Sequence, residues 1–265
     1  MPVTYRSALI TGASSGIGAA FARALPRATA LLLTGRDRER LNALAQELGL
    51  NGRQVRTVIA DLATAEGRQA VVGAAEIARI DLLINNAGVG RLGRVIDNPE
   101  PREAEMVQVN VAAPVELIRG LLPDMLRWAR ESNARCGIIN VASAAAFAPM
   151  PTFATYAASK TFLLNYTEAL AEEMSAEPVD ILALCPGATE TRFFERAGAS
   201  FGSLGRPAMT VMHDAARVAA EGLRELGHAR VHVVGPTNYL ASLAMRLLPR
   251  RFVTAAAETT LQKWK

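Results

Sequence analysis

The sequence predicts an α/β fold in one domain, with a doubly wound, seven-stranded parallel sheet and helices on both faces. The chain has 265 residues, half of them apolar, which suits a single large core. Short apolar runs alternate along it with longer segments of helical period, a pattern typical of strands joined by helical crossovers. Several of the runs are apolar throughout, as expected for strands that are buried on both faces.

Seven strand candidates follow in order, and no internal repeat or linker interrupts them. They are residues 7–11, 29–35, 56–60, 81–86, 137–143, 179–185 and 230–235. The clearest helical segments are 37–48, 99–129 and 155–176. We therefore expect one domain over residues 1–265, with a core at about 5–235 and a helical tail at 236–265.

A glycine-rich turn, TGASSGIG (11–18), follows the first strand and opens the first helix. Gly12, Gly16 and Gly18 let the backbone turn tightly and approach a ligand, and the amides at the start of the following helix favour a phosphate. The spacing differs from the commoner GxGxxG pattern, so the turn alone does not establish nucleotide binding.

The same turn allows a second interpretation, because GASSG (12–16) matches the G-x-S-x-G turn of serine hydrolases. Ser14 would then be the nucleophile and would need a histidine base, and all three histidines lie downstream. However, only eleven residues precede Gly12, too few for the strand and loop that supply the oxyanion hole in that fold. The hydrolase interpretation also gives no role to Lys160.

The second strand ends at Gly35, and Arg36 follows it directly. In dinucleotide-binding folds an acidic residue at this strand end accepts the ribose 2′-hydroxyl, whereas an arginine suits a 2′-phosphate. The lack of a carboxylate at Gly35 and the guanidinium of Arg36 favour NADP(H) over NAD(H). Arg36 could also be one more exposed arginine before a helix that Asp37 caps.

Lysine is rare in this chain: 26 of the 29 Lys and Arg residues are Arg, and Lys160 is the one internal lysine. Tyr156 lies four residues earlier, on the same face of the expected helix. A nearby ammonium would lower the tyrosine pKa from about 10 and make the phenol a better acid–base group. Arginine suits this task less, because it practically never gives up its proton. Ser143 ends an earlier strand, where it could donate to a bound carbonyl oxygen.

Together these motifs resemble those of the short-chain dehydrogenase/reductases. TGASSGIG, NNAG (85–88), Asn110, Ser143, YAASK (156–160) and CPGATET (185–191) occur in that family's order over about residues 5–235. The resemblance implies a Rossmann-like fold and an NADP(H)-dependent oxidoreductase that acts on a carbonyl or a secondary alcohol. It implies that Tyr156 is the acid–base group and that Lys160 holds the nicotinamide ribose and lowers the tyrosine pKa. It also implies that Ser143 orients the substrate and that Asn110 anchors a relay water.

The resemblance further implies a cofactor-binding set, and no metal ligand is predicted. Asp61 and Leu62 would flank the adenine, residues 86–88 the adjoining ribose, and residues 186–191 the nicotinamide. The set comprises Gly12, Ser14, Ser15, Gly16, Ile17, Gly18, Arg36, Asp61, Leu62, Asn86, Ala87, Gly88, Tyr156, Lys160, Pro186, Gly187, Thr189 and Thr191.

The composition of the chain limits the kinds of partner that it is expected to bind. A net charge of +4 spread over scattered arginines indicates neither a nucleic acid nor a membrane. Cys136 and Cys185 match no disulfide framework or zinc motif, and no signal segment or membrane span is recognised. We therefore expect a cytoplasmic protein with a small-molecule substrate.

Segments 144–153 and 192–205, expected to line the substrate pocket, are mostly small or apolar. Such a lining suits an apolar ketone, aldehyde or alcohol, with or without an acidic end. A non-enzymatic NADP sensor is the alternative function; such proteins can lose the tyrosine or the lysine, and this chain keeps both.

Two further expectations concern the surface. By resemblance the helices at 100–129 and 155–176 form a subunit interface of a homodimer or homotetramer. Their apolar positions exceed what one core face needs; these are Val107, Val111, Leu117, Phe162, Leu163 and Tyr166. The tail 237–265 carries an apolar stripe beside arginines, and Pro249 should divide it into two helices. We expect the tail to pack on its own subunit or a neighbour, with a lid or a membrane contact as the alternatives.

Overall fold

The computed structural model describes residues 4–50, 52–198 and 212–262, with side chains described up to residue 257. The strands of the described residues are β1 Ser7–Thr11, β2 Ala30–Gly35, β3 Val55–Ile59, β4 Leu82–Asn85, β5 Cys136–Val141, β6 Val179–Cys185 and β7 Val231–Val233. They form one parallel sheet in the order β3-β2-β1-β4-β5-β6-β7. Because the order reverses between β1 and β4, the sheet is doubly wound, as predicted.

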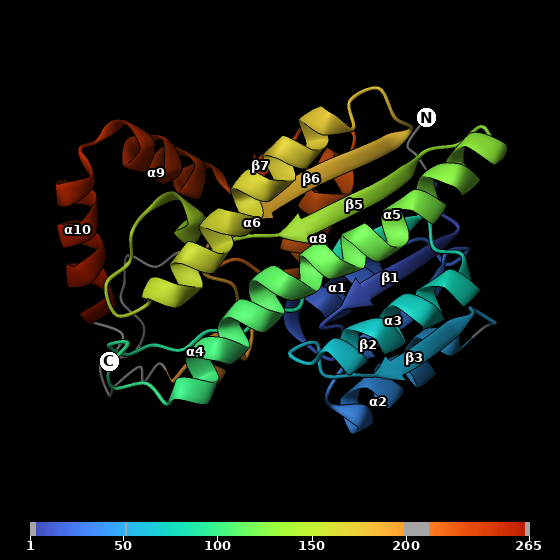
Figure 1. The fold of residues 1–265 in the computed structure, drawn as a ribbon, viewed down its shortest axis with the longest axis horizontal. Coiled ribbons are helices and arrows are strands. Elements are labelled where there is room, and N and C mark those ends of the chain that lie inside the picture. The colour runs from blue at the N-terminus through green and yellow to red at the C-terminus, as the bar shows by residue number, and fades with distance from the viewer. Residues whose placement is uncertain (1–3, 51, 199–211, 263–265) are drawn as a thin grey trace.

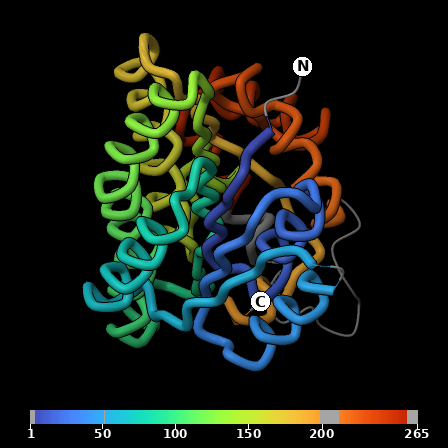
Figure 2. The backbone as a smooth tube through the Cα atoms, turned by 90° about the vertical axis from the view of Figure 1, so that its right-hand side faces the viewer, coloured from blue at the N-terminus to red at the C-terminus, as the bar shows by residue number. Residues whose placement is uncertain are grey.

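Helices cover both faces of this sheet. They are α1 Gly16–Ala24, α2 Arg38–Gly49, α3 Ala65–Ala78, α4 Glu100–Val107, α5 Ala113–Glu131, α6 Ala154–Glu173, α7 Phe193–Arg196, α8 Ala215–Glu225, α9 Pro236–Leu247 and α10 Arg250–Gln262. A π-helical turn, η1 Gln108–Ala112, joins α4 to α5, and a 3₁₀ turn, η2 Ala144–Phe147, follows β5. Figure 2 shows the three layers, with green and yellow helices on one side of the sheet and blue and orange helices on the other.

Neighbouring residues of each strand pack into different cores. In β1, Ala8 and Ile10 lie in the core beneath α1, α2 and α8, whereas Leu9 lies in the core beneath α3, α5 and α6. Side chains alternate between the two faces of a strand, so a strand covered on both sides must be apolar at every position. This is the physical reason for the continuous apolar runs in the sequence.

The predicted element boundaries hold closely. Strands 7–11 and 179–185 form as predicted, and the other five shift or shorten by one or two residues at an end. Asp37 caps α2, because its Oδ1 accepts a hydrogen bond of 3.1 Å from the amide of Arg40. The predicted helix 99–129 is interrupted by η1, a change of hydrogen-bond pattern that apolar periodicity does not reveal.

The carboxyl ends of the strands face the tail, whose two helices lie at the left of Figure 1. Pro249 separates α9 from α10, as predicted. No helix in the described part of the chain combines the length and the apolar character that a membrane span requires.

Candidate functional site

A cavity of about 1250 Å³ opens at the carboxyl ends of the strands. The residues that line it come from the glycine turn after β1, the ends of β2 to β6, and helices α4, α6, α7, α9 and α10. Every site residue predicted from the sequence lines this cavity except Gly18 and Asn110. The structure thus brings together side chains that lie far apart in the sequence, at the edge of the sheet where ligands bind in doubly wound folds.

The glycine turn between β1 and α1 has a backbone that only residues without a side chain fit readily. Gly12 and Gly16 have φ angles of 64° and 56°, in the left-handed region that glycine adopts most readily. A Cβ atom on Gly12 would lie 2.9 Å from the Cα of Ala87, and one on Gly16 would lie 2.8 Å from Thr191 Cγ2. The two positions therefore exclude larger residues, and the amides at the start of α1 border the cavity.

Gly18 has a packing role instead. It lies inside α1, where a Cβ atom would come within 2.5 Å of the carbonyl oxygen of Gly12. Its lack of a side chain lets the helix start close to the turn, so Gly18 shapes the site without lining it.

Asn110 lies behind the cavity wall, in the π-helical turn η1, and is almost completely buried. Its Oδ1 accepts from the Val89 amide at 2.9 Å, and its Nδ2 donates to the Val89 carbonyl at 2.9 Å. Nδ2 also lies 3.0 Å from Ser159 Oγ, which in turn donates to the carbonyl oxygen of Tyr156 at 2.7 Å. Asn110 and Ser159 therefore tie η1 to the helix that carries Tyr156. Ser159 could not be predicted as a site residue, because a serine within a helix gives no signal of its own in the sequence.

Ser143 and Tyr156 meet at the cavity from different elements. Ser143 follows β5 and caps η2, with its Oγ accepting from the Ala145 amide at 3.1 Å. Tyr156 lies in the first turn of α6, and a hydrogen bond joins the two side chains. The ring of Tyr156 stacks on Phe153 with centroids 4.3 Å apart and contacts Phe193 at 5.1 Å. These contacts hold the phenol in one orientation inside an apolar surrounding.

Burial raises the pKa of Tyr156 to about 12, while the hydrogen bond from Ser143 lowers it. The sequence predicted the opposite direction, with Lys160 lowering the tyrosine pKa. In the structure the Lys160 Nζ lies 5.9 Å from the centroid of the Tyr156 ring and donates to the Val141 carbonyl oxygen at 2.8 Å. Desolvation of the phenolate therefore dominates, and the ammonium at this distance does not bring the pKa down. In these surroundings the phenol is protonated at neutral pH.

The ammonium of Lys160 is itself buried. Desolvation lowers its pKa to about 8, with a small opposing effect from Cys185. An ammonium has three donors, and the Val141 carbonyl accepts from one of them. A Cβ atom on Gly88 would lie 3.2 Å from Nζ, so the glycine of the NNAG motif keeps the lysine end of the cavity open.

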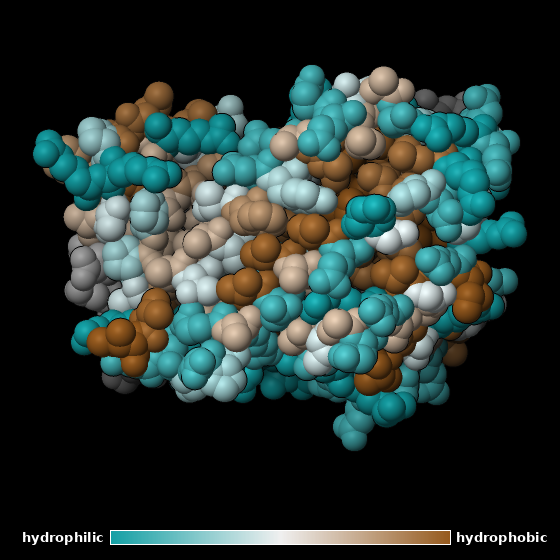
Figure 3. All heavy atoms as spheres, viewed as in Figure 1, coloured by the Kyte–Doolittle hydropathy of each residue, from teal (hydrophilic) through white to brown (hydrophobic). Residues whose placement is uncertain are grey.

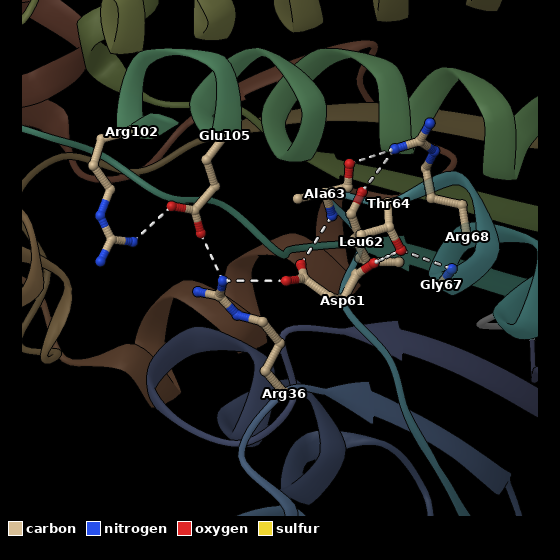
Figure 4. Close-up of polar contacts among 9 residues, drawn as sticks. All are labelled: Arg36, Asp61, Leu62, Ala63, Thr64, Gly67, Arg68, Arg102 and Glu105. Carbon is tan, nitrogen blue, oxygen red and sulfur yellow. Dashed lines mark hydrogen bonds and ion pairs between the residues drawn. The ribbon is translucent and has the colours of Figure 1, made fainter. Parts of the chain in front are cut away.

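Arg36 points toward the cavity from the turn after β2, and Figure 4 shows it between two carboxylates. Its Nη1 lies 2.6 Å from Glu105 Oε1 and 3.7 Å from Asp61 Oδ2. Glu105 belongs to α4 and also binds Arg102 at 2.7 Å. The sequence argument rested on Gly35, which has no carboxylate at the strand end; the structure adds a carboxylate beside Arg36 from α4, which that argument did not include. A pairing of Glu105 with Arg102 could be read from their spacing of three on a helix, but its contact with Arg36 could not.

The other end of the cavity is mostly apolar. Its walls include η2, the segment after β6 and the tail; the apolar lining residues there are Ala144, Ala145, Ala148, Met150, Phe153, Phe193, Phe194, Ala241, Ala244, Met245, Leu248, Phe252 and Val253. Arg91 also borders this end, and its Nε is buried with no hydrogen-bond partner among the described residues. Arg192 and Arg196 line the cavity as well, whereas residues 199–205 of the segment expected at the substrate lie outside the described residues.

The hydrolase interpretation finds no support in the arrangement of the histidines. Among the described residues that line the cavity with Ser14 there is no histidine. His213 lies 2.8 Å from the Asn238 side chain, and His232 lies 2.8 Å from Glu221. Ser14 therefore has no histidine base among the described residues of the cavity lining. Both cysteines are buried free thiols, and the described residues form no cluster of His, Cys, Asp or Glu that could hold a metal.

Comparisons with known proteins agree with this geometry. The sequence pattern of the family described as short chain dehydrogenase matches residues 6–200. A short chain dehydrogenase of Pseudocercospora fijiensis is 35% identical over 191 residues, which cover 70% of this chain and 60% of that protein. Oxidoreductase UcpA of Salmonella typhimurium is 33% identical over 195 residues, which cover 73% of each.

Solved structures share the fold. A 7β-hydroxysteroid dehydrogenase superposes with a TM-score of 0.84 at 24% identity, over 95% of this chain and 96% of that one. A short-chain dehydrogenase from Sphingobium yanoikuyae in complex with NADPH superposes with a TM-score of 0.75 at 29% identity, over 90% and 92% of the two chains. This chain is therefore an oxidoreductase of the short-chain dehydrogenase/reductase family.

Proposed function

We propose that this protein transfers a hydride between NADP(H) and the carbonyl or secondary alcohol of a mostly apolar small molecule. The observation that carries the proposal is the meeting of Ser143, Tyr156 and Lys160 in one cavity with the glycine turn. The turn excludes side chains where a diphosphate would approach, and the lysine has donors to spare for a ribose. These features fit a nicotinamide dinucleotide, and such cofactors are bound in similar solved structures.

A bound nicotinamide cofactor would supply or accept the hydride, and the residues of this chain handle the substrate oxygen and its proton. Ser143 Oγ accepts from the Ala145 amide, so its one hydroxyl hydrogen, which donates to Tyr156 in this structure, is the donor available to a bound carbonyl oxygen. The Tyr156 phenol, protonated at neutral pH because burial raises its pKa to about 12, is the proton donor to the same oxygen in the reductive direction. The ring of Phe153, stacked on Tyr156, and the ring of Phe193, tilted against it, limit the access of water to the phenol.

The preference for NADP(H) over NAD(H) rests on Arg36. Its guanidinium borders the cavity beyond β2, and Arg102 lies on the other side of Glu105. Two guanidinium groups around one carboxylate provide donors for the oxygens of a 2′-phosphate. An L-sorbose reductase of Gluconobacter frateurii, in complex with NADPH, is 25% identical, whereas a relative from Burkholderia phymatum at the same identity is in complex with NAD.

The substrate class follows from the apolar end of the cavity. Aromatic and aliphatic side chains dominate its lining, which suits a hydrophobic ketone, aldehyde or secondary alcohol. The buried Nε of Arg91 has no partner among the described residues, and a cation in an apolar wall favours an anionic ligand. A substrate with an apolar body and a carboxylate is therefore the best match to this cavity.

Oxidation of NADPH against a panel of carbonyl compounds tests the proposal, and the panel should pair hydrophobic keto acids with their methyl esters. Tyr156→Phe should bind NADPH as the wild type does and lower turnover by ~10²–10⁴, the range for lost acid–base catalysis. Near-normal turnover in this variant would refute the mechanism. The hydrolase alternative instead makes Ser14→Ala the inactive variant, in an esterase assay without cofactor. A sensor would bind NADPH tightly and oxidise it with no compound of the panel.

A further inference from the structure

Glu105 lies at the centre of a charged cluster with Arg36, Asp61 and Arg102, at the end of the cavity beyond β2 and β3 (Figure 4). One of its oxygens lies 2.6 Å from Arg36 Nη1, and the other lies 2.7 Å from Arg102 Nη1. Its side chain is 12% exposed, against 51% for Arg36 and 60% for Arg102. The carboxylate is thus the fixed member of the cluster, and the two guanidinium groups reach it from the solvent side.

The charges of this cluster cancel. Arg36 and Arg102 are positive, and Glu105 and Asp61 are negative, with Asp61 Oδ2 3.7 Å from Arg36 Nη1. An arriving 2′-phosphate, with a charge of about −1.5 to −2, therefore meets no net positive charge. The guanidinium of Arg36, which the phosphate would bind, is already paired with the carboxylate of Glu105. Arg36 alone cannot favour the phosphate strongly while Glu105 stays paired with it.

The position of Arg102 gives Glu105 an alternative partner. Arg102 is three residues before Glu105 on α4, a spacing at which side chains of one helix face meet. When Arg36 turns to a phosphate, Arg102 can keep the Glu105 carboxylate paired. Without a phosphate, Glu105 and Asp61 offer acceptors to a ribose 2′-hydroxyl. The same cluster thus accommodates both forms of the ribose, at different electrostatic cost.

We propose that Glu105 sets the discrimination between phosphorylated and unphosphorylated adenosine ribose by competing with the 2′-phosphate for Arg36. The proposal rests on the proposed function, since it assumes that an adenine dinucleotide occupies this end of the cavity. It differs from the usual acidic determinant at the end of β2, because the carboxylate comes from α4, 69 residues along the chain from Arg36.

The test measures binding of two adenosine fragments that carry no nicotinamide, adenosine 2′,5′-bisphosphate and 5′-AMP, by titration calorimetry on the full chain. Glu105→Gln should tighten the bisphosphate about tenfold, the scale of one charge-assisted contact, and should change 5′-AMP by less than about twofold. Arg36→Ala should weaken the bisphosphate about tenfold or more. In the Arg36→Ala background, Glu105→Gln should not increase the affinity for the bisphosphate, because the guanidinium for which Glu105 and the phosphate compete is then absent.

Glu47→Gln is the matched control, because Glu47 pairs with Arg23 at 2.7 Å, neither residue is among those that line the cavity, and both affinities should stay unchanged. Thermal unfolding of each variant verifies that it is folded. Equal bisphosphate affinity in the wild type and Glu105→Gln, or weaker binding in the variant, would overturn the proposal. Fragment binding with this pattern but no turnover of any carbonyl compound would refute the proposed function and leave the role of Glu105 intact. No fragment binding in any variant would overturn both.

Discussion

The buried ammonium of Lys160 makes the free energy of unfolding depend on pH. Its ammonium is buried, donates to the Val141 carbonyl at 2.8 Å and has its pKa lowered by desolvation to about 8. An unfolded chain would give this lysine its ordinary pKa of about 10.4. Between these two values the unfolded state binds more protons than the folded state, so the contribution of Lys160 to the free energy of unfolding rises with pH and is lost as pH falls through 8.

Lys160→Met should therefore remove this pH dependence. From pH 8 to pH 10 the free energy of unfolding of the wild type should rise by about 2 kcal/mol relative to that of the variant, as urea denaturation would measure. Tyr156→Phe is the control. The pKa of Tyr156 is raised from about 10 to about 12, so its contribution is lost only above pH 10 and is flat in this window. A constant difference between the wild type and Lys160→Met would show that the lysine does not titrate there.

At the scale of elements, α9 and α10 have different relations to the cavity. Asn238 on α9 donates to the Val234 carbonyl at 2.9 Å and lies 2.8 Å from His213, and Arg246 stacks on Phe147 at 4.7 Å. These contacts dock α9 on its own subunit, as the sequence analysis expected. Phe252 and Val253 of α10 border the cavity, so α10 also has the position of the lid that was the alternative.

Two truncations distinguish the docking of α9 on its own subunit from a role of α10 as a lid over the cavity. Deleting residues 249–265 removes α10 and should raise KM for hydrophobic carbonyl substrates about tenfold, since part of the apolar wall is lost, with the Kd of NADPH and the melting temperature nearly unchanged. Deleting 237–265 also removes the α9 contacts and should lower the melting temperature. Steady-state kinetics and thermal unfolding give the two readouts. Unchanged KM in the shorter deletion would show that α10 does not shape the substrate site.

At the scale of the whole molecule, apolar side chains gather on the face formed by α5 and α6, as Figure 3 shows. Phe162 is 41% exposed and stacks on Tyr166 with ring centroids 5.8 Å apart. Val107, the last residue of α4, is also exposed. Leu117 and Leu163, however, are buried within the subunit, so the sequence analysis was wrong to assign them to the surface. Leu117 packs in the core beneath α3, α5 and α6.

We expect this face to pair subunits in a homo-oligomer. Phe162→Glu should shift the protein to a monomer at micromolar concentration by light scattering, because a carboxylate cannot be buried there without a partner. Leu240→Glu on α9, where the native leucine is 65% exposed, is the control and should leave the assembly unchanged. A monomeric wild type would contradict the expectation.

The sequence alone determined the parallel sheet, the glycine turn and the positions of Ser143 and Tyr156, because these depend on local rules: apolar periodicity, glycine conformation and spacing along one helix. Tertiary structure decided which charges share a site and how strongly each group is desolvated. It placed Glu105 of α4 against Arg36, and it buried Tyr156 deeply enough to raise a pKa that the sequence predicted to fall. Coulomb and desolvation energies depend on distance and burial in three dimensions, and neither can be read from residue spacing when the partners come from separate elements.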